Sequence, residues 1–185
     1  KTLKRRGIIG ALKHYGLPTI LARIRENATR QGAQQRTDDL PVTVVRSLNS
    51  DKTVTLLDQR RPDVIVIANA PILAPKVLKT AQLCAINFHS GRLPDYGGVA
   101  SEYWAIHNGE TKAWATLHRA TDKLDSGEIL AEESVEIQAA ESPETLHTRL
   151  LEKAAAMLPP LLDTLADHGV QPIRAPGPAT LRPWP

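Results

Sequence analysis

The sequence predicts an α/β fold: a Rossmann-like, mostly parallel sheet flanked by helices. Short runs of β-branched and other apolar residues alternate with helical patterns, which is typical of strand–helix–strand units with right-handed connections. The run Asp63–Ala68 (DVIVIA) is apolar almost throughout, as expected for a strand covered on both faces. A length of 185 residues fits one domain with a substantial core.

The first forty residues show helical patterns but no apolar run typical of a strand. Leu3–His14 and Thr19–Arg30 show helical periodicity, and Gln31–Leu40 is polar. Residues 1–36 also hold nine Lys and Arg side chains against the single carboxylate of Glu26. This basic segment is compatible either with an anionic partner or with an ordinary solvated helix face.

Strands are expected in the middle of the chain. The pattern predicts five of them in one sheet, the first three parallel: Val42–Val45, Val64–Ala68, Leu83–Phe88, Lys112–Arg119 and Glu128–Ile137. A helix capped at Ser50 or Asp51 and ended by Pro62 separates the first two strands.

A long helix is expected near the C-terminus. Ser142 as N-cap, Pro143 at the first helical position and Glu144 in the first turn mark its start, and Gly169 follows its end at His168. One domain is therefore assigned to residues 1–170, and residues 171–185 are interpreted as a Pro-rich tail or linker.

Polar side chains follow the third predicted strand. Asn87 and His89 are two residues apart, so the period of a strand places both on one face at its end. The turn 121–127 after the next strand carries Asp125. Such an amide, imidazole and carboxylate would suit acyl transfer as oxyanion donor, acid and base.

A longer pattern surrounds these three residues. Asn87-x-His89 is followed by Leu93-Pro94-x-Tyr96-x-Gly98, Trp104-Ala105-Ile106, Gly109-Glu110, His118 and Asp125-x-Gly127-x-Ile129. With this spacing, about residues 40–165 resemble the folate-dependent formyltransferases, which include the glycinamide ribonucleotide, methionyl-tRNA and sugar N-formyltransferases.

This resemblance implies a function. The formyl group of 10-formyltetrahydrofolate would pass to a primary amine, with Asn87 and His89 at the oxyanion and Asp125 supporting the imidazolium and taking the amine proton. The family would place the pterin against two segments with these residues: Pro71, Ile72, Leu73, Thr121, Asp122, Lys123 and Leu124.

Other expectations concern substrate and partners. The family's usual first β-α-β unit has no counterpart before residue 40: either the chain lacks it, or that part was removed or lies elsewhere, and a main indicator of substrate identity is lost with it. The amine could be that of an amino sugar, an amino acid or a biosynthetic intermediate. The RNA-binding barrel of methionyl-tRNA formyltransferases is missing after residue 170, and nucleic acid is not expected. A small-molecule amine, a cytoplasmic location and no membrane contact are expected, and a homodimer stays open.

Two rival functions remain at this point: a formyltetrahydrofolate hydrolase, and a truncated binding or assembly module without catalysis. A metal site is not expected, since the spacing of the His and Asp residues fits no zinc pattern. Gly97-Gly98 is interpreted as room for the backbone to approach the substrate, and His118 as a core or supporting residue. Tyr103 and Trp104 are interpreted as helix residues that pack in the core.

Overall fold

The computed structural model describes residues 43–175 and 177–185. The predicted helices Leu3–His14 and Thr19–Arg30, the polar stretch after them and Val42 all lie outside these residues, as does the region where a first β-α-β unit was not expected.

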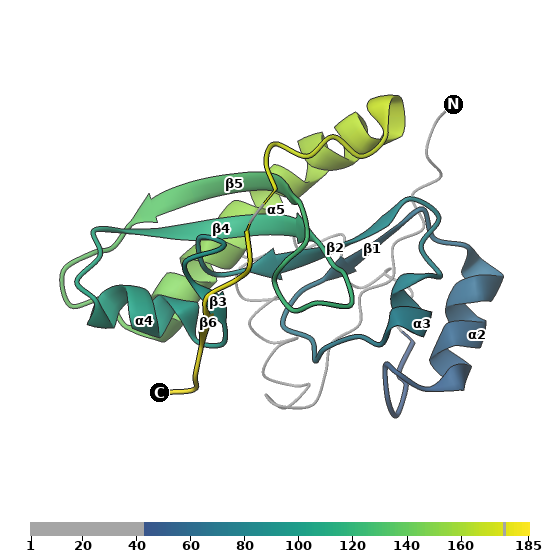
Figure 1. Ribbon diagram of the computed structural model, residues 1–185, viewed down its shortest axis with the longest axis horizontal. Helices are drawn as coiled ribbons and strands as arrows, with labels where there is room; N and C mark the ends of the chain where they lie inside the picture. Colours follow the sequence, from purple (N-terminus) through teal and green to yellow (C-terminus); the bar gives the residue numbers. More distant parts are fainter. Residues whose placement is uncertain (1–42, 176) are drawn as a thin grey trace, which may run out of the picture.

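The described part of the chain is built around a four-stranded sheet in the order β1-β2-β4-β5 (Figure 1). The strands are β1 (Val64–Ile67), β2 (Cys84–His89), β4 (Lys112–Arg119) and β5 (Ile129–Glu136). β1 and β2 pair in parallel, whereas β2–β4 and β4–β5 pair antiparallel. The α/β Rossmann-like class is confirmed, and the sheet within the described residues is mixed.

Two of the strand predictions are wrong in this part of the chain. No strand forms over Thr43–Val45; Thr43 and Val45 instead line an apolar hollow between α2 (Asp51–Arg60) and β1, while Val44 is 76% exposed. Of the three strands expected to be parallel, only β1 and β2 are. After β2 the chain passes through α4 (Ser101–His107), and β4 then runs back along β2 in the antiparallel direction, with Ile86 opposite Arg119 and His89 opposite Thr116.

The helices cover the sheet as their sequences predict. α2 is capped by the Ser50 side chain, which accepts a hydrogen bond from the Thr53 N–H, and it ends before Pro62 with Arg61 in the left-handed region. α3 (Pro75–Leu78) lies beside α2 in the connection from β1 to β2 (Figure 1). This connection holds the two parallel strands together at one end of the molecule.

The long C-terminal helix forms as predicted. α5 (Pro143–His168) starts after the Ser142 cap and ends at Gly169, and it lies behind β4 and β5 (Figure 1). Its apolar stripe is buried against the sheet and consists of Leu146, Leu150, Ala154, Met157, Leu161 and Leu165. This face closes the core and leaves the ends of β2 and β4 free for polar side chains.

The Pro-rich segment after α5 does not project from the domain. Its backbone pairs with Ile129 at the start of β5, and Arg174 binds Glu132. Further along, β6 (Leu181–Arg182) pairs in parallel with β3 (Gly97–Gly98). The segment therefore crosses from β5 to the loop in front of α4, as its yellow trace shows (Figure 1). Among the described residues, no helix is long and apolar enough to cross a membrane.

Candidate active site

The end of β2 brings polar groups to the edge of the sheet. Asn87 lies directly opposite His118 on β4, and His89 lies opposite Thr116. The imidazole of His89 is buried, with 7% of its surface exposed. The prediction that Asn87 and His89 share one face at a strand end agrees with this register.

Asp125 reaches the same place from the loop between β4 and β5. It is 4% exposed and adopts the left-handed backbone region with φ of 48°. Its Oδ2 accepts a hydrogen bond from the Gly98 N–H at 2.8 Å and lies 3.8 Å from Nδ1 of His89. The three residues predicted to act together are therefore neighbours, although they come from two separate segments.

The path of this loop depends on Gly127. A Cβ built at Gly127 would lie 1.8 Å from the Arg119 carbonyl oxygen, so no residue with a side chain fits there without moving backbone. The close approach lets the loop fold back toward β4, and Asp125 is turned into the site.

His89 has a defined tautomer. Its Nε2 lies 2.5 Å from the Tyr96 carbonyl oxygen, and since a carbonyl can only accept, Nε2 must carry the proton. Ser101 donates its hydroxyl to the same carbonyl. Nδ1 is therefore the ring atom that faces Asp125 and is available to a reacting molecule.

His118 is the second histidine of the site. Its Nδ1 donates to the Arg119 carbonyl at 3.0 Å, and its Nε2 accepts from the Asn87 side-chain amide at 3.1 Å. Burial lowers the pKa of His118 to about 4, His89 acts in the same direction, and Asp125 and the Arg119 carbonyl oppose it. His118 is accordingly neutral at pH 7 and orients Asn87, which is more than a residue of the core would do.

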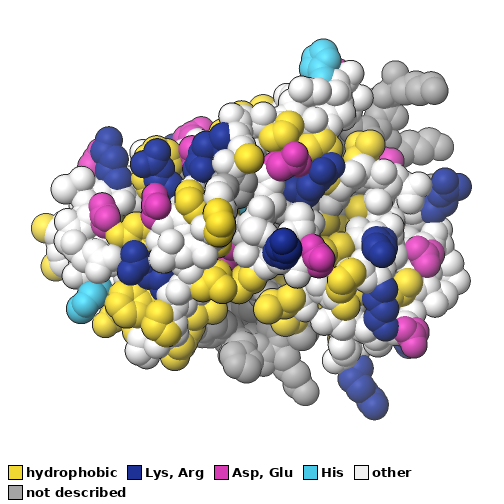
Figure 2. Space-filling view, viewed as in Figure 1, with side chains coloured by type: hydrophobic (Ala, Val, Ile, Leu, Met, Phe, Trp, Pro, Cys, Tyr) yellow, Lys and Arg dark blue, Asp and Glu magenta, His cyan; other side chains and the backbone are white. Residues whose placement is uncertain are grey.

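A hollow beside these groups contains all seven residues predicted to bind the pterin. It is open to solvent on one side. Its lining includes Asn87, His118 and Asp125, together with Pro71, Ile72, Leu73, Thr121, Asp122, Lys123 and Leu124. Hydrophobic side chains are visible on the face between the β4–β5 loop and α3 (Figure 2). A second, apolar hollow lies beneath α2, and none of Asn87, His89, His118 and Asp125 lines it.

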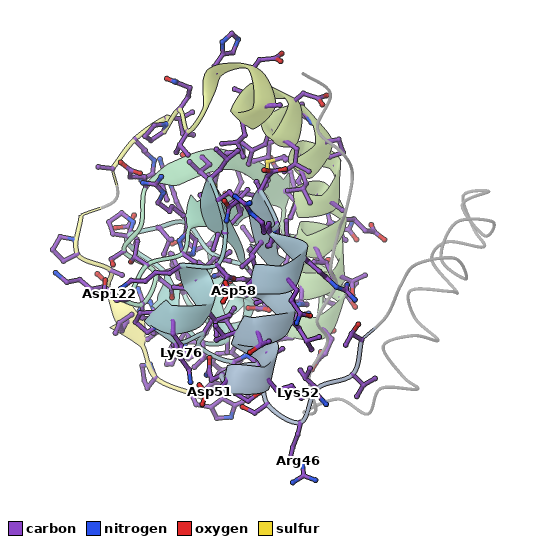
Figure 3. The ribbon with its side chains drawn as sticks, turned by 90° about the vertical axis from the view of Figure 1, so that its right-hand side faces the viewer. Arg46, Asp51, Lys52, Asp58, Lys76 and Asp122 are labelled. Carbon is purple, nitrogen blue, oxygen red and sulfur yellow. The ribbon has the colours of Figure 1, made fainter. Side chains whose placement is uncertain are left out.

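One wall of this hollow is held by Asn49, which the sequence analysis did not single out. Its side-chain amide donates to the Ile72 carbonyl at 2.9 Å, and its carbonyl accepts from the Ala74 N–H at 2.7 Å. The ion pair of Lys76 with Asp51, at 2.6 Å, joins α3 to the start of α2 next to it (Figure 3). No local pattern marks Asn49, since its partners are more than twenty residues away.

With this geometry in view, the chain can be compared with known proteins. Residues 19–162 match the family described as Formyl transferase. The chain belongs to this family. It is 31% identical over 145 residues to a methionyl-tRNA formyltransferase of Clostridium acetobutylicum. The matched region covers 77% of this chain and 47% of that protein.

Solved structures with the family fold are also similar. Phosphoribosylglycinamide formyltransferase from Bacillus halodurans matches with a TM-score of 0.61 at 23% identity, over 74% of this chain and 75% of that one. HypX from Aquifex aeolicus in complex with tetrahydrofolic acid matches with a TM-score of 0.62 at 20% identity, over 72% of this chain and 23% of that one. The chain spans less than half the length of the curated relatives ArnA and methionyl-tRNA formyltransferase.

A partly buried contact between a carboxylate and a histidine lies behind the site of this formyl transferase domain. Glu102 of α4 accepts a hydrogen bond from the Ser90 hydroxyl and pairs with His147 of α5. Burial alone would raise the pKa of Glu102, but the His147 and Ser90 contacts outweigh it and hold the pKa below its usual range. The pair connects the residue after His89 to both helices.

Two further expectations can be compared with the contacts. Gly97-Gly98 was expected to admit the substrate, but a Cβ at Gly98 would first meet the Arg182 backbone oxygen, at 2.8 Å. Tyr103 and Trp104 are half-buried, and the ring of His107 stacks on Tyr103. Within the described ranges, no group of three or more His, Cys, Asp or Glu residues is placed to hold a metal ion.

Proposed function

We propose that this formyl transferase domain moves a formyl group from 10-formyltetrahydrofolate to the primary amine of a small molecule. The observation that supports it best is that Asn87 and Asp125 line the hollow that contains the predicted pterin-binding residues, with His89 placed 3.8 Å from Asp125. The fold of a relative that was crystallised with tetrahydrofolic acid agrees with a folate donor.

The reaction needs an oxyanion donor and two proton transfers. The amine nitrogen attacks the formyl carbon, a tetrahedral centre forms, and the bond to the folate nitrogen then breaks. Asn87 has two amide hydrogens; one is bound to His118, and the other can donate to the oxyanion. Because His118 fixes the amide beforehand, little reorganisation is needed when the charge develops.

His89 and Asp125 handle the protons. A second proton on Nδ1 of His89 would face the reacting centre, where it can stabilise the oxyanion and then pass to the folate nitrogen. Asp125, 3.8 Å from that atom, supports the positive charge and accepts the proton of the attacking amine, directly or through water. The N–H of Gly98 holds the Asp125 carboxylate in place from the other side.

The pterin is assigned to the hollow. The backbone of residues 71–73 and 121–124 supplies polar groups, and Ile72 and Leu124, 71% and 43% exposed, offer apolar surface to a bound ring. A flat heterocycle that buries these side chains would gain hydrophobic free energy, which gives the exposed apolar residues a physical reason.

The experiment uses the chain with 10-formyltetrahydrofolate and a panel of amino sugars, amino acids and other small amines. Formation of tetrahydrofolate and of the N-formyl product is measured for wild type, Asn87→Ala and Asp125→Asn. Loss of an oxyanion donor should lower turnover by about 10²–10³-fold, and Asp125→Asn should cost at least as much. Formate without an N-formyl product would identify a hydrolase instead. Near-wild-type rates in both variants would place the chemistry elsewhere.

A further inference from the structure

The segment Ala179–Pro183, here called the C-terminal strap, lies along the loop that carries Gly98. Leu181 and Arg182 are in register with Gly97 and Gly98. The Gly97 N–H donates to the Thr180 carbonyl at 3.1 Å, and the Thr180 N–H donates to the Pro94 carbonyl at 2.8 Å. The loop is thus held by backbone hydrogen bonds from a segment more than eighty residues away in sequence.

The two glycines are shaped to fit the strap. A Cβ at Gly97 would lie 3.0 Å from the Ala179 Cβ, and one at Gly98 would lie 2.8 Å from the Arg182 carbonyl oxygen. Gly98 also has φ of 90°, which side-chain-bearing residues rarely adopt. Both glycines therefore allow the close approach of the strap, at the cost of a loop that would be flexible without it.

Side chains fasten the strap beside α4. The Arg182 guanidinium lies 4.7 Å from the Tyr96 ring centroid and 5.9 Å from that of Trp104. The indole N–H of Trp104 donates to the Pro183 carbonyl at 2.9 Å. Among the described residues, Arg182 has no carboxylate partner, so its aromatic contacts are its principal anchor. Hydrophobic side chains gather on the face around this part of the molecule, at the lower left of Figure 2.

One hydrogen bond connects this arrangement to the reactive carboxylate. The Gly98 N–H, on the residue paired with Arg182, donates to Asp125 Oδ2 at 2.8 Å. We propose that the strap positions Asp125 through Gly98, with Arg182 as the positioning residue that holds the strap in place. This inference rests on the proposed function for the role of Asp125.

The location of the other anchor supports this assignment. The segment is already fastened to β5 by the ion pair of Arg174 with Glu132 and by the backbone bridge to Ile129. Attachment of the segment to the domain therefore does not need the contacts at Arg182. Those contacts instead restrain β3, in which the Gly98 N–H donates to Asp125.

The test compares two arginines on the same segment. Arg182→Ala should release the strap from the loop, whereas Arg174→Ala removes an ion pair at β5 and serves as the matched control. Arg182→Lys keeps a cation near the Tyr96 ring and should retain most of the kcat and of the Gly98 amide protection of the wild type. For each variant, hydrogen exchange of the Gly98 amide is followed by NMR, together with kcat and KM for formyl release from 10-formyltetrahydrofolate.

In Arg182→Ala, exchange at Gly98 should be faster and kcat should fall about tenfold or more, since small displacements of a catalytic group are costly. KM for the folate should change little, because Arg182 does not line the hollow. Equal effects of Arg174→Ala and Arg182→Ala on kcat would overturn the inference, as would unchanged exchange at Gly98. Full activity of Asp125→Asn would instead overturn the proposed function, and Gly98 exchange would still report on the strap.

Discussion

The side-chain amide of Asn87 lies 3.1 Å from Nε2 of His118, directly across the pairing of β2 with β4. Since Nδ1 of His118 is engaged by the Arg119 carbonyl, Nε2 is left as an acceptor, and the amide orientation of Asn87 follows from it. The site therefore contains a neutral histidine, His118, that orients the side-chain amide of Asn87.

The first prediction concerns the orientation of Asn87 by His118. His118→Phe keeps an aromatic ring, though a larger one, and removes the acceptor, so the Asn87 amide can rotate and kcat should fall about ten- to a hundredfold. Binding of 5-formyltetrahydrofolate, measured by calorimetry, should weaken less. His168→Phe, at the exposed end of α5, is the control. Unchanged kcat in His118→Phe would show that Asn87 needs no partner.

The second prediction concerns pH and stability. The folded-state pKa of His118, about 4, lies below its ordinary value of 6.5, so the unfolded chain binds more protons between these values. The free energy of unfolding should therefore fall as pH decreases from about 6.5 to 4, by up to roughly 3 kcal/mol from this residue. Urea unfolding of wild type and His118→Phe at several pH values would measure it. An equal decline in both proteins would contradict the assignment.

The third prediction concerns the partly buried pair behind the site. Glu102→Gln retains the shape but loses the charge next to His147, and should reduce the free energy of unfolding by roughly 1–3 kcal/mol at pH 7. Because the pKa of Glu102 is held below its usual range, this contribution is present at neutral pH and is lost as pH falls through the folded-state pKa. Thermal melts of Glu102→Gln beside Glu128→Gln, a partly exposed surface pair with Arg119, provide the comparison. A difference that persists at pH 3 would argue for packing as the cause.

The fourth prediction concerns the wall of the hollow. Asn49→Ala removes both side-chain hydrogen bonds to the loop 72–74, so KM for the folate should rise several-fold while kcat stays near wild type. Asn49→Asp keeps the acceptor for the Ala74 N–H, so its KM for the folate should lie between those of wild type and Asn49→Ala. A matched control is Asn108→Ala, whose amide contacts the Tyr96 hydroxyl away from the hollow. A fall in kcat at constant KM would contradict this role for Asn49.

Local patterns predicted the parts of the fold that local physics decides. The cap at Ser142 and the stop at Gly169 bounded α5 correctly, and the two-residue period placed Asn87 and His89 on one strand end. The resemblance to the family supplied the seven predicted pterin-binding residues, all of which line the hollow. Periodicity could not have grouped them, because they come from two separate loops.

The missed features depend on contacts between distant segments. Val44 has the β-branched side chain of a strand residue, but strand formation also needs a partner strand, and the described residues 43–45 have none. The antiparallel pairing of β4 with β2 is a contact between separate segments, and no local pattern distinguished it from a parallel one. The strap pairs with Gly97 across more than eighty residues. Its Pro-rich composition is typical of a linker, so the sequence did not predict this pairing.

Gly127 also offers a diagnostic for sequence comparison. Its missing side chain is required by the Arg119 carbonyl group, whose oxygen lies 1.8 Å from where a Cβ would stand. A related chain with any other residue at this position must therefore route its β4–β5 loop differently, whatever reaction it performs. In such a chain the aspartate corresponding to Asp125 could not be assumed to point inward, and transferring a catalytic role by alignment would be unsafe. The identity of one uncharged, chemically silent position thus indicates when the motif around it can be trusted.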